Sequence, residues 1–467
     1  MKKDVLLMAH LMRRAGFGEG LRELNLRLLR DYDDVVDELI QSEDVEWMGD
    51  SMVRRFDDEA SGMINPPGAA RNWIYQMLTT KAPLREKVAL FWHGIFATGT
   101  PKVINGRVLS DQIEMFRRFG LGKLDELLLQ LGMNPAMIVW LDNQDNHKDA
   151  INENWGRELL ELFSMGVGNY SEEDIKECAR AFTGWSIGNK DYMMVRALRD
   201  SDWPYGRIAY HFEYNKDEHD FGSKTFLGQT GNFGGEDIIG IICQQESTAR
   251  FISRHLYHFF VEDEPPVPSW AFTPPQNPRA IDFLVQAYFD SDHNIGEMLR
   301  ALFKSDFFKS DSIRFAKVKG PTEFVVGLLR ITGEFDRPKR EMLPVYQQIK
   351  WMGQELLNPP SVEGWHQGME WIDTGALVER INFASEKFGE SGKSGIENIV
   401  AMVIERCGDE PDAVDLVDQC LWALGGMSVD LDTRLALGNL ARQDVNDHSK
   451  VQQILKSVVS SKEFQLA

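Results

Sequence analysis

Apolar side chains recur along most of this chain at the three- and four-residue spacing of an α-helix. Residues 21–40 show the pattern, with charged residues between Leu21, Leu24, Leu28, Leu29, Val36 and Leu39. Such spacing gives a helix one apolar stripe. The pattern recurs in 84–97, 122–132, 153–165, 172–182, 237–243, 248–261, 280–289, 295–304, 321–332 and 343–357. We therefore predict a mainly α protein, a multi-helix bundle of packed αα-hairpins.

Strand patterning is confined to residues 186–230. Tyr210, Phe212 and Tyr214 alternate with His211 and Glu213, which is the period of two expected for a strand. Gly, Asn and Asp residues flank this zone on both sides. The pattern predicts a small β insertion in an otherwise helical protein.

Two loops bear on the domain organisation. Residues 264–278 are rich in proline and predict a stiff, extended connection. Residues 389–395 are rich in Gly and Ser and predict a flexible break. A length of 467 residues allows about three domains at roughly 150 residues each. We instead predict one large helical domain over 1–387, which contains the β insertion, and a C-terminal helical segment over 388–467.

Charge and composition exclude several classes of protein. Lys and Arg number 51 against 72 Asp and Glu, a net charge of −21, which argues against binding to nucleic acid or to an anionic membrane surface. No apolar run reaches the roughly 18–20 residues of a membrane span. The four cysteines form no C-x-x-C pair, which favours reduced thiols.

The N-terminus is a poor secretory signal, because its short apolar stretch runs directly into Arg13 and Arg14. As written, the sequence predicts a cytoplasmic protein. Export stays open if the start lies further upstream.

The densest polar segment lies in residues 141–163. On a helix, Asn154, Arg157, Glu158 and Glu161 fall within an arc of roughly 100°. Ser171 and Asp174 form a capping-box variant that begins the next helix.

That second helix carries Glu177 and Arg180 on its polar side, and a hairpin could bring Glu177 near Glu158 and Glu161. Carboxylates beside Arg and Asn suit acid–base or metal-assisted hydrolysis. The alternative is a solvated or inter-helix face, with Arg157 and Glu161 as an i,i+4 ion pair. No cofactor is evident from the sequence, and the question of a divalent metal stays open.

Three further features have both a functional and a structural interpretation. His93 lies in an apolar helix, where a satisfied core histidine is the commoner outcome. The segment with His219, Asp220 and Lys224 is either a loop-borne site or a structured turn, and its residue order fails the phosphate-loop pattern. Trp365 lies in a loop rich in Pro and Gly, either as an aromatic face for a sugar or peptide or as an anchor on the core.

Several of these segments resemble one known family. The segments are 134–143, 152–163, 179–185, 219–228 and 360–365, and the similarity runs from about His10 to Gln465. Their order and spacing resemble the large bacterial domain-of-unknown-function family 1800.

This resemblance implies a largely helical protein without an established reaction. Family members are often exported and are often encoded beside proteins similar to alkaline phosphatases and sulfatases, so a partner of that class is expected. Where members often carry a second histidine two residues after the one matching His93, this chain has Ile95, which leaves a metal site using both incomplete. His255 and His258 stand where the family tends to have Lys and Arg, which favours basic surface positions.

Two hypotheses follow. In the first, the protein is a hydrolase in which Glu158 and Glu161 supply acid–base or ligand oxygens, Arg157 holds charge, and His93 or His219 carries protons. The residues expected to contact substrate are Asn154, Arg180, Asp220, Lys224, Trp185 and Trp365. In the second, it is a non-catalytic binding or assembly protein acting with a phosphatase- or sulfatase-like partner, and the polar arc is an internal network between helices.

Overall fold

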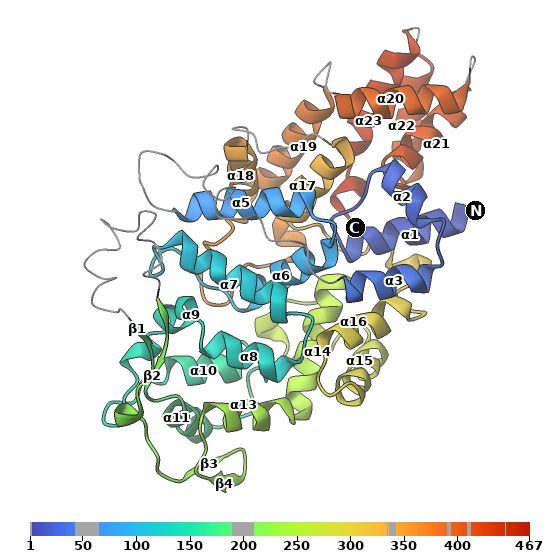
Figure 1. The fold of residues 1–467 in the computed structure, drawn as a ribbon. Helices are drawn as coiled ribbons and strands as arrows, with labels where there is room; N and C mark the ends of the chain where they lie inside the picture. Colours follow the sequence, from blue (N-terminus) through green and yellow to red (C-terminus); the bar gives the residue numbers. More distant parts are fainter. Residues whose placement is uncertain are drawn as a thin grey trace.

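A computed structural model describes residues 2–42, 65–188, 210–333, 335, 342–389, 394–408, 412–443 and 445–467. Helices dominate these residues, and Figure 1 follows them from blue to red along the chain. The N-terminal part contains α1 (Lys2–Arg14), α2 (Leu21–Arg27), α3 (Tyr32–Gln41), α5 (Pro66–Thr79), α6 (Pro83–Ile95) and α7 (Gly106–Phe119). The next part contains α8 (Leu124–Gly132), α9 (Pro135–Trp140), α10 (Asn154–Glu161), α11 (Glu172–Ala181) and α13 (Gly235–Cys243).

The remaining helices complete the body and one end of the molecule. They are α14 (Glu246–Phe260), α15 (Pro278–Asp290), α16 (Ile295–Lys304), α17 (Pro321–Thr332), α18 (Met342–Trp351) and α19 (Thr374–Gly389), followed by α20 (Ser394–Cys407), α21 (Ala413–Ala423), α22 (Leu431–Ala441) and α23 (Asp447–Val459). Helices α20 to α23 pack on one another at one end, and α23 also packs on α19 (Figure 1). The boundary predicted between residues 387 and 388 falls in the last turn of α19.

The strands are short and paired locally. β1 (Trp185–Gly188) pairs antiparallel with β2 (His211–Tyr214), and β3 (Lys224–Phe226) pairs antiparallel with β4 (Gln229–Gly231). The predicted class, mainly α with a small β insertion, is confirmed. Within the predicted insertion, residues 189–209 lie outside the described part of the chain.

Several helices begin at an Asn-Pro pair. In α5, α9 and α15 the Asn side chain accepts the N–H of a residue in the first turn, at 2.7 Å for Gly68, 3.0 Å for Ala136 and 3.1 Å for Ala280. The proline that follows needs no hydrogen-bond acceptor and already has a helical φ. Sequence chemistry therefore fixes where these helices start.

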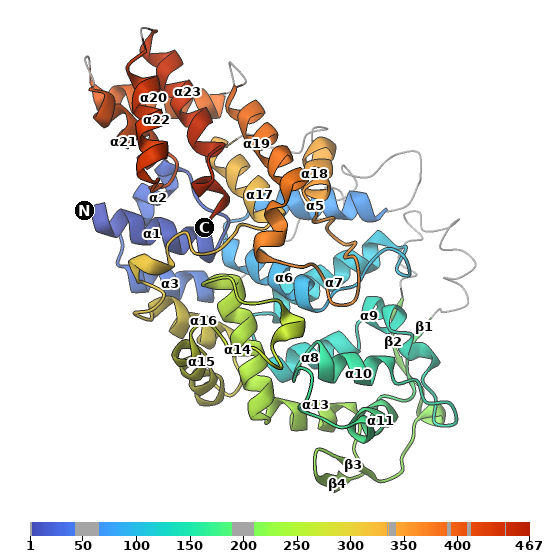
Figure 2. The same cartoon turned by 180° about the vertical axis from the view of Figure 1, so that it is seen from behind.

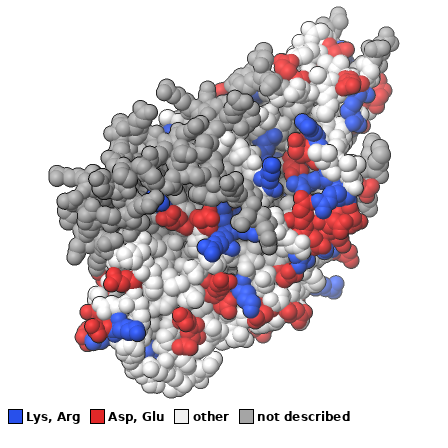
Figure 3. All heavy atoms as spheres, viewed as in Figure 1, with Lys and Arg blue, Asp and Glu red and all other residues white. Residues whose placement is uncertain are grey.

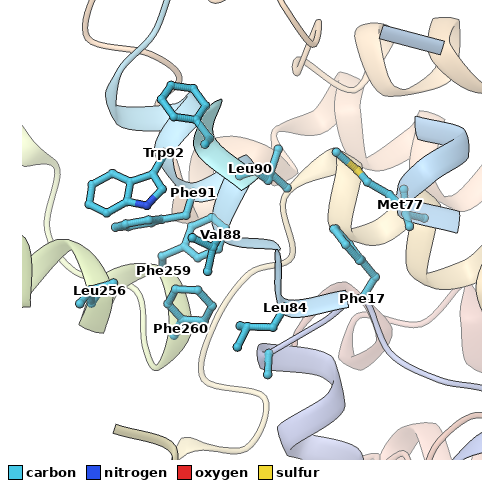
Figure 4. Close-up of a cluster of buried hydrophobic side chains, with 14 of the residues drawn as sticks. Phe17, Met77, Leu84, Val88, Leu90, Phe91, Trp92, Leu256, Phe259 and Phe260 are labelled. Atoms are coloured by element: carbon cyan, nitrogen blue, oxygen red, sulfur yellow. The ribbon is translucent and has the colours of Figure 1, made fainter. Parts of the chain in front are cut away.

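Helix α6 lies at the centre of the apolar core. Its side chains are buried on almost every face, and its buried charges are paired, Glu86 with Arg117 and Lys87 with Glu323. Figure 4 shows Val88 and Phe91 of α6 lying against Leu256, Phe259 and Phe260 of α14. The Phe91 and Phe259 ring centroids are 5.2 Å apart. The α6–α14 contact thus joins the N-terminal helices to the second half of the chain, as Figure 2 shows from behind.

A buried carboxylate lies beside this core. Glu323 in the first turn of α17 accepts hydrogen bonds from the backbone N–H of Gly320 at 2.7 Å and from Lys317 at 3.2 Å, and it pairs with Lys87 of α6. Lys87 and Lys317 are 1% and 2% exposed, so the charges depend on one another rather than on water. The three cross-links hold α6, α17 and the 317–320 segment together.

The surface carries both signs of charge. On the face seen in Figure 3, red and blue side chains lie next to one another over the described elements. Every helix in the described residues is too short or too polar to cross a lipid bilayer.

We expect Glu323→Gln to lower the free energy of unfolding by about 3–5 kcal/mol, because Lys87 and Lys317 would lose a buried counter-charge. Denaturant unfolding followed by circular dichroism measures this. The control Glu297→Gln removes a solvent-exposed partner of Arg300 and should cost less than about 1 kcal/mol. Equal effects of the two substitutions would contradict the role given to Glu323.

Candidate functional site

Helices α10 and α11 form the predicted hairpin. They approach closely at Gly156, where a Cβ atom would lie 3.0 Å from the backbone nitrogen of Ala179. Ser171 begins α11 with a reciprocal capping box: its hydroxyl accepts the N–H of Asp174, and the Asp174 carboxylate accepts the N–H of Ser171. Gly156 and the capping box at Ser171 therefore fix how the polar faces of α10 and α11 are oriented.

Arg157 does not form the predicted ion pair with Glu161. Its guanidinium instead contacts Glu172 of α11 at 2.9 Å and Glu153 at 3.3 Å. The hydrogen bond that Arg157 donates to Glu172 raises the pKa of Arg157. Arg157 pairs with Glu172 rather than with Glu161 because the close packing at Gly156 brings the start of α11 within reach of Arg157.

Arg180 is the centre of a polar network on the other side of the hairpin. It donates to Glu177 at 2.7 Å and to Asp220 at 2.7 Å. Glu177 also accepts the backbone N–H of Thr225 at 2.8 Å, so its carboxylate serves the 219–225 loop. Lys224 is buried and donates to the carbonyl oxygen of Asp220 at 2.6 Å. These contacts hold the loop on α11.

His219 and Trp185 are buried within the same region. His219 Nδ1 lies 2.8 Å from the carbonyl oxygen of Thr183, so Nδ1 carries the proton and donates it there. The Trp185 ring packs edge-on against Phe182, with the ring centroids 4.9 Å apart. Asn154, by contrast, is exposed at the start of α10.

His93 is enclosed by two tryptophans. Its ring packs edge-on against Trp73 and Trp365, with centroid distances of 5.3 and 5.2 Å, and Nε2 accepts the backbone N–H of Leu357 at 3.1 Å. Burial lowers the pKa of His93 to about 3. The His93 imidazole is therefore neutral at neutral pH and packs against Trp365.

A large open cavity lies beside these elements. Its volume is about 870 Å³. Its walls come from α14, the proline-rich loop after α14, the end of α10 with residues 162–169, and the 363–370 loop. Figure 2 shows α10 and α14 on the same side of the molecule. With the end of α6 at residues 94–95, four parts of the chain that are far apart in sequence, 94–95, 161–169, 247–281 and 363–370, thus meet around one space.

Carboxylates gather at one wall of this cavity. Glu161 and Glu363 line it, and Glu158 lies one turn before Glu161 on α10. Burial and the negative charges of Glu161 and Glu363 raise the pKa of Glu158 to about 7, against the opposing charge of Arg157. The Tyr170 hydroxyl donates to Glu161 at 3.1 Å. Glu158 thus keeps its proton to a higher pH than an ordinary glutamate does, and its neighbour Glu161 has a hydrogen bond from Tyr170.

The opposite wall is cationic and aromatic, but its charge is already paired. Arg254 contacts Glu264 at 2.8 Å, donates to the carbonyl oxygen of Thr273 at 2.9 Å and lies over the Trp270 ring at 4.5 Å. The proline-rich loop is therefore tied to α14. It is not the extended connection predicted from sequence, because a 3-10 helix over Val267–Ser269 folds it.

His255 and His258 also line this wall, and the prediction of basic surface positions is wrong for both. They are 7% and 5% exposed, and burial lowers the pKa of each to about 3. His258 Nδ1 accepts the backbone N–H of Glu264 at 2.8 Å. Within the described residues, no three His, Cys, Asp or Glu side chains are arranged to share a metal ion.

The cavity contains only part of the predicted site. Glu161 and Trp365 line it and Glu158 is adjacent, whereas Arg180, Asp220, Lys224 and His219 form the loop network described above. Sequence reasoning missed the cavity residues Arg254, Asp263, Glu264, Glu363, His366 and Glu370. The proline-rich loop and the tryptophan-rich loop were both visible in the sequence, but nothing in the sequence indicated that they meet.

Comparison with protein families identifies the family of this chain. A family model described as "Protein of unknown function (DUF1800)" matches residues 10–466. The chain belongs to this family. The resemblance noted from the sequence motifs is thereby confirmed over nearly the whole length of this DUF1800 protein. No curated protein and no solved structure matches the chain.

The raised pKa of Glu158 should appear in the pH dependence of stability. Between the ordinary glutamate pKa of 4.5 and about 7, the unfolded chain loses the Glu158 proton while the folded chain keeps it. The stability of the wild type relative to Glu158→Gln should therefore fall as pH rises through this window and then level off. Denaturant unfolding at a series of pH values measures the difference.

The exposed Glu173→Gln on α11 is the control for that experiment and should show no such fall. A flat difference for Glu158→Gln would contradict the raised pKa.

We expect Arg180→Gln to loosen the 219–227 segment, because Glu177 and Asp220 would lose the guanidinium that binds both of them. Hydrogen exchange followed by mass spectrometry should show faster exchange in 219–227 and unchanged exchange in α10. Lys176→Gln, which removes an exposed cation from the same helix, is the control. Unchanged exchange in 219–227 for Arg180→Gln would contradict the role of the network.

Proposed function

We propose that this DUF1800 protein is a hydrolase whose active site is the cavity beside α10. The observation that carries the proposal is the pairing of Glu158, with its pKa raised to about 7, with Glu161 on the cavity wall. A carboxyl group whose pKa is raised to about 7, next to a second carboxyl group, is an arrangement that suits acid–base hydrolysis. Glu158 would donate a proton to the leaving group, and Glu161 would act as base or nucleophile.

The walls of the cavity favour a neutral or cationic sugar polymer as substrate. Trp270, which is half-buried, and Trp365, which is 8% exposed, both line the cavity, and aromatic rings suit the apolar faces of sugar rings. Glu161, Asp263, Glu363 and Glu370 give the lining an acidic character that disfavours anionic substrates, since Arg254 is already paired with Glu264. A pair of carboxylates is also the usual equipment for cleavage of a glycosidic bond.

The other predicted residues have supporting roles in this proposal. Arg157 lowers the negative charge around Glu158 while it joins α10 to α11. His93 positions Trp365 from behind, and His219 holds the loop after β2. Arg180, Asp220, Lys224 and Trp185 support the hairpin that carries the two carboxylates, and Asn154 lies at its exposed end.

A second candidate is a binding or assembly protein that holds a ligand without turnover, acting with a phosphatase- or sulfatase-like partner. The rim of the cavity supports it. Phe272 and Met369 line the cavity and are 87% and 73% exposed, which is typical of residues that contact a partner or a polymer.

Incubation with neutral and amino-sugar oligosaccharides separates the two candidates. If the protein is a glycosidase, new reducing ends should form. Glu158→Gln and Glu161→Gln should each lower kcat by about 10²–10⁴-fold, because each removes one half of the acid–base pair. Glu173→Gln outside the cavity is the control and should keep wild-type kcat.

Binding measured by calorimetry on the same panel completes the test. Binding without product by the wild type would favour the second candidate. Binding to none of the oligosaccharides, together with no product, would contradict the proposed substrate class.

A further inference from the structure

The interior around Glu323 holds more cations than carboxylates. The cationic side chains that interact there are Arg13, Arg14, Lys87, Lys317, Lys319 and Arg380, and the carboxylates that act on them are Glu323, Asp263 and Glu262. A buried charge without a counter-charge destabilises the folded state strongly. An acidic protein of net charge −21 thus encloses a local excess of basic side chains, among which burial and the charge of Arg13 hold the pKa of Lys319 well below its usual value.

A small, partly open cavity lies beside this region. Its volume is about 30 Å³, and since one water needs about 10–15 Å³ of such space, it holds one or two water-sized species. Arg13 of α1 and Lys319, just before α17, line it, together with Glu19 and Glu323. The rest of the lining is mainly apolar, with Phe324 and Phe464 among its members.

Both carboxylates at this cavity are already paired with other cations. Glu19 takes both of its contacts from Arg27, each at 2.7 Å. Glu323 is occupied by Lys87, Lys317 and the backbone N–H of Gly320. Neither is therefore available as the counter-charge of Arg13 or Lys319.

Arg13 and Lys319 have neutral partners instead. Arg13 donates from Nη1 to the carbonyl oxygen of Gly425 at 2.8 Å, and Lys319 donates to the carbonyl oxygen of Phe464 at 2.7 Å. Nε and Nη2 of Arg13 are buried and have no hydrogen-bond partner among the described residues. Burial and the positive charges of Arg14 and Arg314 lower the pKa of Arg13 to about 9, which leaves the side chain charged at neutral pH.

We propose that the cavity between Arg13 and Lys319 binds a single monoatomic anion, with chloride as the physiological ligand. A halide supplies both missing elements, a negative charge and an acceptor for the free N–H groups of Arg13. The size of the cavity selects the ligand, because phosphate and sulfate have five heavy atoms and do not fit a space of one or two water-sized species. The anion links α1, the start of α17 and the turn at Gly425 that follows α21.

Crystals of the full chain grown in sodium bromide test the proposal directly, since bromide scatters anomalously and replaces chloride. We expect an anomalous peak between the Arg13 guanidinium and Lys319 Nζ. Only a water molecule in the cavity, or bromide only at surface sites, would overturn the proposal, because Lys319 would then be neutral and the cavity simply hydrated.

Thermal unfolding gives a second, independent readout. At constant ionic strength, replacing gluconate by chloride or bromide should raise the Tm of the wild type and saturate, because a ligand of the folded state stabilises it. Arg13→Met should abolish the halide dependence, and the exposed Arg22→Met on α2 should keep it. If Arg13→Met does not fold, the wild-type titration decides: equal Tm values in gluconate and chloride would overturn the proposal.

Discussion

The structure depends on one buried carboxylate, Glu323, and the cations that surround it. The cluster joins α6 to α17 through Lys87 and fixes the 317–320 segment through Lys317. The neighbouring backbone N–H of Val318 donates to Asp263 at 2.8 Å, and a Cβ atom on Gly368 would lie 3.4 Å from the Asp263 carboxyl carbon. Asp263 and Gly368 both line the large cavity. The buried charges around Glu323 therefore also fix the positions of two cavity loops, the one that contains Asp263 and the one that contains Gly368.

Among the described residues, some polar side chains have hydrogen-bond and ion-pair partners that match their charge, and others do not. Arg180, Glu177 and Asp220 bond one another and the nearby backbone, so they stabilise a loop. Glu158 is different, since burial and two neighbouring carboxylates keep its proton near neutral pH. Strong perturbation beside an open cavity is what distinguishes a candidate site from a structural network. The same reasoning separates Arg254, which is paired with Glu264, from Arg13, which has no carboxylate partner among the residues that the structure describes.

Local chemistry in the sequence predicted much of this architecture. The helical class, the capping box at Ser171 and the short strands around Phe212 follow from periodicity and from interactions within a few residues. The polar arc on α10 was also visible, and Glu158 and Glu161 were chosen from it.

Contacts between distant segments were not predictable in this way. Arg157 takes Glu172 rather than Glu161 because of close packing at Gly156, and Glu363 reaches Glu158 only through the fold. His255 and His258 were misplaced for the same reason, because residues far along the chain bury them.

The most direct test of the account is a carboxyl titration of glutamate-labelled protein by carbon NMR, with Glu158→Gln used to assign the signal. The account predicts a Glu158 pKa of about 7 that changes when an oligosaccharide fills the cavity; an ordinary glutamate pKa that is insensitive to ligand would contradict it.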